Sequence, residues 1–267
     1  MRLSRRCRIG AAYLDEIDPS IVIRGMDPGM PAEDLTTAPY MGGWGSRMTG
    51  QHWNQIEASV TFAIDIPKRN LARRREVFDR VIAWAKPKTF LRFNSRPDQR
   101  LYVDKVIYPG AGDLWDWTAE YTIGFRAYGV PFWESEEPAE WSKQTVATSD
   151  GAACVIQAEV EGTAPGALDV SFRNISGKQI NNVKVRVGSA TPLTMNGVNL
   201  AANETLVMSH TRAGLLKITA ENGTASRNVY GQLTGGDDLY VNPGAVNVRV
   251  DASRAGVLTV SSYARWL

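Results

Sequence analysis

Two stretches of the chain alternate between apolar and polar residues with the period of a β-strand. They span residues 56–66 and residues 115–127. Because successive side chains of a strand point to opposite faces of its sheet, each stretch predicts a strand with one buried face. The second would be about 40 Å long at ~3.3 Å per residue, which favours a strongly curved or barrel-like sheet. The residues expected on the buried faces are Ile56, Ala58, Val60, Phe62, Ile64 and Ile66, and then Trp115, Trp117, Ala119, Tyr121, Ile123, Phe125 and Ala127.

Residues 68–85, between these strands, carry apolar residues at helical spacing. Pro67 suits the first turn of a helix, and Pro87 ends it. The arginines at 73–75 and at 80 are expected on the other, solvated faces. Shorter strands at 89–93 and 100–108 complete a compact α+β domain. The expected buried stripe of the helix consists of Leu71, Phe78, Val81, Ile82 and Ala85.

Residues 25–50 show little periodicity and are rich in glycine. Pro28-Gly29 and Gly42–Gly45 are turn or loop signals. A segment of this length without structure of its own is usually functional or mobile. We therefore predict an irregular, extended arm near 25–50. Its candidate contacts with a neighbouring subunit are Met41, Trp44, Met48 and Trp53.

The composition changes at the acidic, proline-containing residues 135–148, which we interpret as a linker between an N-terminal domain at 1–134 and a second domain at 149–267. The second domain has no helical pattern. Short apolar runs recur there, separated by turn signals such as Asn196-Gly197 and Asn222-Gly223. Eight or so short strands at this spacing predict an antiparallel sandwich.

The net charge and the cysteine content limit the kinds of function that the sequence allows. The formal net charge is only +2 over 267 residues, which argues against a general nucleic-acid binder. Cys7 and Cys154 stand alone, as reduced thiols of a cytosolically made protein do. No stretch is apolar for the roughly 20 residues that a membrane helix requires, and the basic N-terminus lacks the apolar core of a signal peptide.

No catalytic, cofactor or metal motif is present in the sequence. The two histidines, His52 and His210, have no acid or cysteine at triad or metal-ligand spacing. Nucleophile-elbow and phosphate-loop patterns are also missing. Carboxylate pairs occur as in any soluble chain and sit in no motif, so a glycosidase stays open at this point. Exposed tryptophans could stack on sugars or pack on a neighbouring subunit.

The order of these segments resembles the distal tail proteins (Dit) of phages with long non-contractile tails. The resembling N-terminal run is 65–133, with the helix RREVFDRVIAWAK, the strand TFLRF, the segment RPDQRLYVDKVIY and the stretch YGVPFWES. The C-terminus adds DDLYVNPGAVNVRV and VLTVSSYARWL. The fold class expected is therefore an N-terminal α+β split-barrel-like domain with one helix and an extended arm, followed by an all-β galectin-like sandwich.

The resemblance implies a structural protein of the virion and no enzyme. Such proteins form a ring, usually a hexamer, between the tail tube protein and the tail-tip complex. The sandwich projects outward and can dock a receptor-binding protein. Phage DNA passes through the central channel without specific binding, and no membrane or cofactor is involved. Assembly takes place in the bacterial host cytoplasm.

Two other functions stay open on the sequence alone. A carbohydrate-binding module acting in host recognition would need a cluster of exposed tryptophan or tyrosine side chains on one face of the sandwich. A hydrolase with a lectin-like appendage would need a pocket with converging carboxylates in the N-terminal domain.

Overall fold

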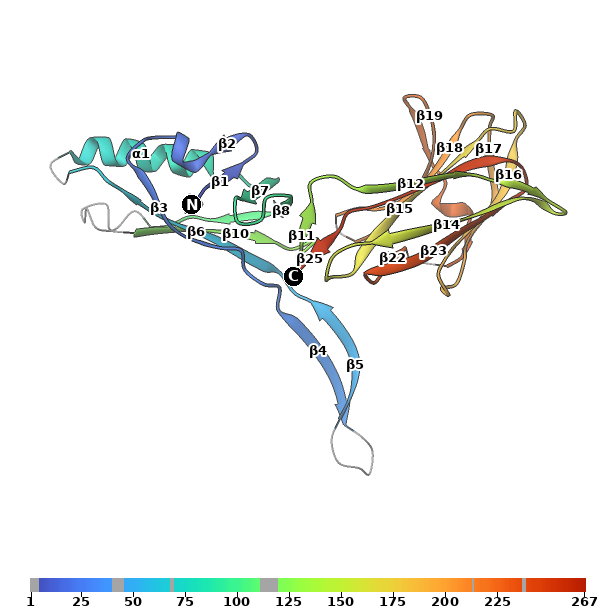
Figure 1. The fold of residues 1–267 in the computed structure, drawn as a ribbon, viewed down its shortest axis with the longest axis horizontal. Helices are drawn as coiled ribbons and strands as arrows, with labels where there is room; N and C mark the ends of the chain where they lie inside the picture. The colour runs from blue at the N-terminus through green and yellow to red at the C-terminus, as the bar shows by residue number, and fades with distance from the viewer. Residues whose placement is uncertain (1–4, 40–45, 68–69, 111–119, 213, 237–238) are drawn as a thin grey trace. The chain divides into compact units, whose positions relative to one another are not determined.

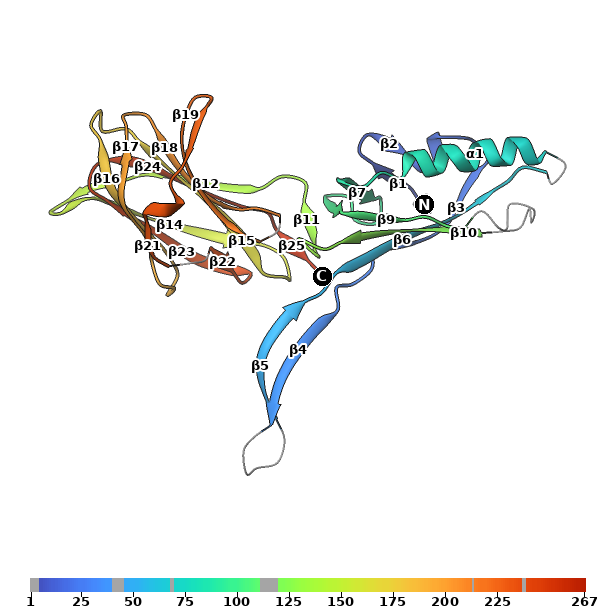
Figure 2. The same cartoon turned by 180° about the vertical axis from the view of Figure 1, so that it is seen from behind.

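The structure is a computed structural model that describes residues 5–39, 46–67, 70–110, 120–212, 214–236 and 239–267 (Figures 1 and 2). The chain divides into two compact units. Unit 1 comprises Met1–Glu134 together with Leu267, and unit 2 comprises Ser135–Trp266.

Unit 1 is built from two antiparallel sheets, one helix and a separate hairpin. One sheet runs in the order β2 (Ala12–Tyr13), β1 (Cys7–Ile9), β7 (Thr89–Phe93), β8 (Gln99–Val103) and β11 (Trp133–Ser135). The other runs in the order β3 (Ile21–Asp27), β6 (Ile56–Ile64), β10 (Glu120–Ala127) and β9 (Lys105–Ile107). A short 3-10 helix, η1 (Leu14–Glu16), follows β2.

The first alternating stretch forms β6, and the described part of the second forms β10. The two pair antiparallel from Ile56↔Ala127 to Ala63↔Glu120. Every residue expected to be buried in these strands is buried, as the strict alternation predicted. Trp115, Trp117 and Ala119 lie outside the described residues, so the length of the second strand stays a prediction.

Helix α1 (Leu71–Trp84) is the α-helix of the described residues, and its position matches the prediction. The side chain of Asn70 caps its first turn by accepting a hydrogen bond from the Arg73 N–H. The predicted buried stripe is confirmed at Phe78, Val81 and Ala85 and wrong at Leu71 and Ile82. The buried positions are Arg74, Val77, Phe78, Val81 and Trp84, whereas Leu71 and Ile82 are only partly buried.

Aromatic contacts with β10 explain which face of the helix is buried. Phe78 packs edge-on against Tyr121 with ring centroids 5.1 Å apart, and Trp84 packs against Phe125 at 6.3 Å. The indole N–H of Trp84 donates to the Ala12 carbonyl at 2.8 Å. Aromatic side chains bury more area than aliphatic ones, so the face that contains them turns to the sheet. Arg74 shares this face and is carried into the interior with it.

The predicted irregular arm is wrong in its conformation. Residues 25–50 contain the end of β3 and most of a β-hairpin made of β4 (Glu33–Pro39) and β5 (Ser46–Trp53). The hairpin is a two-stranded sheet of its own, apart from the other sheets of unit 1 (Figure 1). The apolar residues of these two strands do not alternate with polar ones, so they carry no period-2 signal, although their backbones pair as a ladder.

Unit 2 consists of two antiparallel sheets. The first has the order β12 (Ala139–Gln144), β24 (Gly256–Ser262), β15 (Gly166–Asn174), β18 (Thr205–His210), β19 (Leu216–Asn222) and β20 (Ala225–Asn228), with β22 (Tyr240–Val241) also on β15. The second has the order β13 (Val146–Thr148), β14 (Gly151–Val160), β23 (Gly244–Ala252), β16 (Ile180–Val187), β17 (Leu193–Leu200) and β21 (Leu233–Gly235). The remaining elements are η2 (Tyr230–Gln232) and β25 (Arg265–Trp266).

Two segments of unit 2 differ from the sequence interpretation. The predicted linker at 135–148 holds β12 and β13, which are edge strands of the two sheets. Asn196-Gly197, expected to be a turn, lies inside β17. There Gly197 has φ +68°, and the pairing with β16 shifts register between Ile180 and Asn182. The asparagine-glycine pair therefore forms a β-bulge, which uses the same left-handed glycine conformation as a hairpin turn.

Both sheets of unit 2 contribute alternate residues to one apolar core. Strand β14 supplies Cys154, Ile156, Ala158 and Val160, while its other face is exposed. Phe172 from β15 and Leu258 from β24 lie in the same cluster. Burial of alternate residues from two sheets in one core is the arrangement of a sandwich.

The packing of α1 generates a first prediction. Phe78→Ala removes a ring that is 5% exposed and in contact with Tyr121, and it should lower the free energy of unfolding by about 3–5 kcal/mol. Asp79→Ala, at the exposed neighbouring position, should change it by less than about 0.5 kcal/mol. Chemical denaturation of both variants measures the difference, and a loss below about 1 kcal/mol for Phe78→Ala would show that the helix does not pack on this face.

A second prediction concerns unit 2. A fragment of residues 135–266 should fold by itself into an all-β monomer with a cooperative thermal transition, because the unit has its own core. A fragment of residues 149–266 lacks β12 and leaves the ladder of β24 from Val257 to Ser262 open on that side. It should melt at a lower temperature and aggregate, since open strand edges pair with other chains. Circular dichroism and light scattering test both, and equal behaviour of the fragments would contradict the assignment of β12 to this unit.

Candidate interaction surfaces

The hairpin of β4 and β5 contains the residues predicted to contact a neighbouring subunit. Its strands pair from Glu33↔Trp53 to Pro39↔Ser46, with a register shift between Thr36 and Thr37. Met41 and Trp44 lie outside the described residues, and of Met48 only the backbone pairing with Thr37 is described. Trp53 is partly buried and packs edge-on against Phe132, with ring centroids 5.8 Å apart. Of the four candidates, Trp53 therefore serves at least to attach the hairpin.

The base of the hairpin is held by contacts with backbone groups, which the sequence analysis did not identify. The indole N–H of the fully buried Trp133 donates to the Pro28 carbonyl at 3.0 Å. Gly29 has φ +66°, and a Cβ at this position would lie 2.1 Å from the Glu57 carbonyl oxygen. Only glycine fits so close to another backbone. The one sequence signal here was Pro28-Gly29, which marked a turn without indicating its partner.

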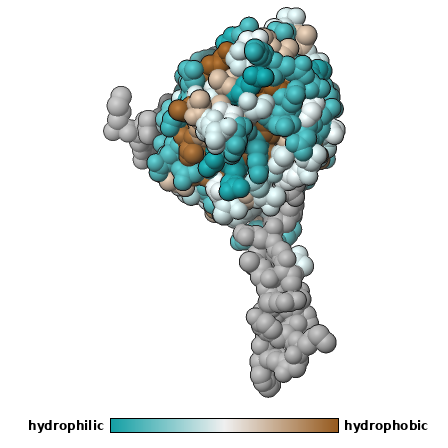
Figure 3. Space-filling model, turned by 90° about the vertical axis from the view of Figure 1, so that its right-hand side faces the viewer, coloured by the Kyte–Doolittle hydropathy of each residue, from teal (hydrophilic) through white to brown (hydrophobic). Residues whose placement is uncertain are grey.

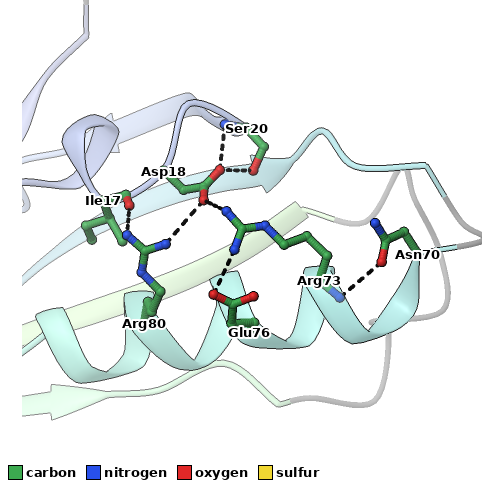
Figure 4. A network of polar contacts seen from close by, with 7 residues as sticks. All are labelled: Ile17, Asp18, Ser20, Asn70, Arg73, Glu76 and Arg80. Carbon is green, nitrogen blue, oxygen red and sulfur yellow. Dashed lines mark hydrogen bonds and ion pairs between the residues drawn. The ribbon is translucent and has the colours of Figure 1, made fainter.

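Asp18 organises a second site, at the start of α1 (Figure 4). Its carboxylate is 4% exposed. One oxygen accepts hydrogen bonds from the N–H and hydroxyl of Ser20, at 3.0 and 2.7 Å. The other oxygen pairs with the guanidinium groups of Arg73 and Arg80, and Arg80 also donates to the Ile17 carbonyl. The carboxylate thus joins the loop after η1 to the helix.

These partners decide the charge state of Asp18. The Ser20 hydroxyl hydrogen bond, the Ser20 N–H and the charges of Arg73 and Arg80 lower the pKa of this carboxyl, and they outweigh the desolvation that raises it. A carboxyl whose pKa is lowered in the folded state stabilises the protein above its unfolded pKa. That contribution is lost as the pH falls through the folded pKa. The arginines at 73 and 80, expected on a solvated face, therefore have a structural partner.

The outer face of the second sheet of unit 2 holds a polar depression of about 270 Å³. Its lining includes Asp150, Asn182, Lys184, Asn196 and Asp251. The strands of this sheet, β13, β14, β23, β16, β17 and β21, contain no aromatic residue. The side of unit 2 seen in Figure 3 is largely hydrophilic, with small hydrophobic areas between polar residues. A stacking platform for sugar rings is thus missing from this sheet.

The described residues contain no group of three or more histidine, cysteine, aspartate or glutamate side chains that could hold a metal ion. Within the same residues, no helix has both the length and the apolar character needed to cross a membrane. Cys7 and Cys154 are both buried and unpaired, and burial raises the pKa of each thiol.

Comparison with known proteins identifies the fold. Neither a family model nor a curated protein matches the sequence. Among solved structures, the Dit protein of phage SPP1 is similar over 98% of this chain and 99% of its own, with a TM-score of 0.66 and 12% sequence identity. The chain has the fold of a distal tail protein. A chain of the phage p2 baseplate in its activated conformation is similar over 96% of this chain and 97% of its own, with a TM-score of 0.44 and 11% identity.

The resemblance noted in the sequence is confirmed at the level of the fold. The strings that carried it fall on the elements of this distal tail protein fold. RREVFDRVIAWAK covers most of α1, and TFLRF is β7. RPDQRLYVDKVIY contains β8 and β9. VLTVSSYARWL contains most of β24 and all of β25. At 12% identity, the two chains share the fold although most of their individual residues differ.

The Asp18 site of this distal tail protein fold generates a third prediction. Asp18→Asn should lower the free energy of unfolding by about 1–3 kcal/mol at neutral pH, because an amide N–H₂ replaces the oxygen that faces two guanidinium donors. The deficit relative to the natural chain should shrink as the pH falls through the folded pKa of Asp18, below its ordinary value of about 3.9. Denaturant titrations between about pH 7 and pH 2 measure it.

Glu76→Gln is the matched control, since Glu76 is 56% exposed and pairs with the same Arg73. It should cost less than about 0.5 kcal/mol. Equal stabilities of Asp18→Asn and the natural chain at neutral pH would show that Asp18 does not hold the loop to the helix.

Proposed function

We propose that this chain is a structural subunit of a bacteriophage tail tip, a distal tail protein that forms a ring between the tail tube and the tip complex. The observation that carries the proposal is the distal tail protein fold over nearly the full length of both chains. The SPP1 protein is described as a paradigm of the hub of the adsorption apparatus in phages that infect Gram-positive bacteria. On this proposal the chain acts in the virion, after assembly in the cytoplasm of the bacterial host.

The hairpin supports a role in subunit contact. A closed ring repeats one head-to-tail contact, so each copy must present two different surfaces. A two-stranded hairpin in water is marginally stable without packing against something else. The hairpin of β4 and β5 is a sheet of its own, and its base is fixed by Trp53, Gly29 and Trp133. We propose that the rest of the hairpin lies on the neighbouring subunit, with Met41, Trp44 and Met48 in the contact.

The remaining partners follow from the same role. The ring, a hexamer on this proposal, contacts the tail tube protein on one side and the tail-tip protein on the other. Unit 2, as a galectin-like sandwich, docks a receptor-binding protein. Phage DNA passes through the channel without specific binding, in keeping with a net charge of only +2. No cofactor, membrane or chemical reaction belongs to this function.

The carbohydrate-binding alternative finds less support. Its requirement was a cluster of exposed aromatic side chains on one face of the sandwich. The sheet with the polar depression carries no aromatic residue in its strands, and the exposed Tyr230 and Tyr240 lie outside that sheet, in η2 and β22. The hydrolase alternative required converging carboxylates in unit 1. Several carboxylates of unit 1 instead pair with arginines: Asp18 with Arg73 and Arg80, Asp15 with Arg6, and Glu57 with Arg126.

The hairpin provides the test of the proposed function. Residues 35–51 are replaced by Asn-Gly, a two-residue hairpin turn, so that the pairs Glu33↔Trp53 and Asp34↔His52 and the packed base are retained. The trimmed chain should melt within a few degrees of the natural one, because the base carries the packing. Phages complemented with it should fail to complete tail tips, as seen by electron microscopy.

The natural chain, expressed in the same complementation experiment, is the control. Complete tail tips built from the trimmed chain would show that the hairpin is not an assembly element. A natural chain that is missing from purified tails, or that hydrolyses a polysaccharide through one identifiable carboxylate, would contradict the structural role itself.

A further inference from the structure

The sequence contains two Asn-Gly pairs, and the structure places them in different surroundings. Asn196-Gly197 lies inside β17, whereas Asn222 is the last residue of β19 and Gly223 follows it. In such a pair the main-chain nitrogen of the glycine can attack the side-chain amide carbon of the asparagine, because glycine has no Cβ to hinder the approach. The reaction also requires rotation of both groups, so the surroundings decide which pair reacts.

The pair at 222–223 lies at an exposed turn. Asn222 pairs with Ala225, so Gly223 and Thr224 form a two-residue hairpin turn, with Gly223 at φ +59° in the first central position. Both residues of the pair are exposed, and apart from the chain neighbours no heavy atom lies within 4 Å of the place where a Cβ of Gly223 would be. Among the described residues, neither the Asn222 side chain nor the Gly223 N–H makes a hydrogen bond. The attacking nitrogen and the amide carbon are therefore unhindered.

The strand that follows the turn, β20, lies at the edge of its sheet, and all its residues are exposed. Its pairing with β19 ends at the turn, with Asn222 opposite Ala225. Solvent-exposed backbone pairs at such a position open at a much lower free energy than the core of the protein. Opening of this last pair frees the main chain of Asn222 to turn its side chain towards the Gly223 nitrogen.

Asn196-Gly197 is also exposed, but hydrogen bonds hold both of its reacting groups. The Asn196 amide nitrogen donates to the Thr234 hydroxyl at 2.9 Å, and the Gly197 N–H donates to the Asn182 side-chain oxygen at 3.4 Å. Strand β17 lies between β16 and β21, and Met195 and Val198 on either side of the pair are fully buried. Rotation at this pair would break hydrogen bonds and move core residues, so Asn196-Gly197 is an internal control for Asn222-Gly223.

We propose that Asn222-Gly223 is a site of spontaneous modification, at which Asn222 becomes aspartate or isoaspartate. The Gly223 nitrogen loses its proton to hydroxide and attacks Cγ of Asn222. The new C–N bond closes a five-membered imide, and the bond from Cγ to Nδ2 breaks. The leaving nitrogen takes a proton from water, which releases ammonia and restores the hydroxide. Water then opens the imide at one of its two carbonyl groups, so the net reaction consumes water and releases ammonia without any change of oxidation state.

The two products change the turn in different ways. Aspartate adds a negative charge beside Glu221, whose carboxylate accepts a hydrogen bond from the Thr219 hydroxyl at 2.9 Å. Isoaspartate also lengthens the main chain by a methylene group, which the geometry of a two-residue turn does not accommodate. Arg227 of β20 bonds to Glu204 at 2.8 Å, so the rest of this strand stays attached. The modification therefore alters the turn and leaves the core of unit 2 in place, and it does not depend on the proposed tail-tip role.

Ageing of the purified full chain tests the proposal. Folded samples are kept at mildly alkaline pH, and peptide mapping by mass spectrometry follows the replacement of NH₂ by OH at both asparagines. An isoaspartate-specific methyltransferase identifies the isoaspartate product. Asn222 should react at least about tenfold faster than Asn196, because the hydrogen bonds at 196–197 need to add only ~1.4 kcal/mol to the barrier for this ratio. In the denatured chain the two rates should become similar, since both pairs are then free to rotate.

Asn222→Gln is the matched variant, because its longer side chain cannot close the five-membered imide. Residue 222 of this variant should stay unmodified while Asn196 ages as in the natural chain. Three results would overturn the proposal: no change at Asn222 under conditions that modify the denatured chain, equal rates at Asn222 and Asn196 in the folded chain, or an equally large ratio in the denatured chain. Aspartate without any isoaspartate would overturn the imide route, because direct hydrolysis of the amide gives aspartate alone.

Discussion

Strands β6 and β10 pair from Ile56↔Ala127 to Ala63↔Glu120, and other elements of unit 1 are attached to this pair. Helix α1 packs on β10 through Phe78 and Trp84, and β3 pairs with the other edge of β6. The hairpin of β4 and β5 connects β3 to β6, so its base is fixed by the same ladder. Burying the apolar face of two long strands therefore determines both where the helix lies and where the hairpin begins.

The described packing contacts of that hairpin lie at its base. At its base, Gly29 lies against the backbone of Glu57, and Trp133 and Phe132 contact Pro28 and Trp53. Along its strands, the backbone pairing of the described residues is the ladder between β4 and β5. Ordering such a hairpin on a partner costs conformational entropy. Ring assembly that uses the hairpin should therefore depend on concentration or on the rest of the tail as a template.

The sequence predicted those elements whose burial differs between two faces. The alternation in β6 and β10 and the stripe of α1 are direct consequences of a core on one side. Leu71 and Ile82 were wrongly assigned to the buried face because they are as apolar as Val77, and only the contacts of Trp84 and Phe78 with β10 select the buried face. Strand β12 was read as linker because, at an edge, only Trp141 of its residues packs on the core.

For the candidate contact residues, the sequence could not show which other residues they contact. Trp53 was selected as an aromatic residue in a glycine-rich segment, yet its described contact is with Phe132 of the same unit. The sequence did not reveal that Arg8 and Arg92 are cross-strand neighbours, because only the pairing of β1 with β7 brings them together. A signal was present within β7 and β8, where Phe90, Arg92, Arg100 and Tyr102 alternate with apolar core residues. A solvated strand face has no need of aromatic residues, which leave apolar area in water. On an alternating strand, the residues of the buried face are selected by the core. The residues of the other face can therefore indicate a contact with another segment or molecule.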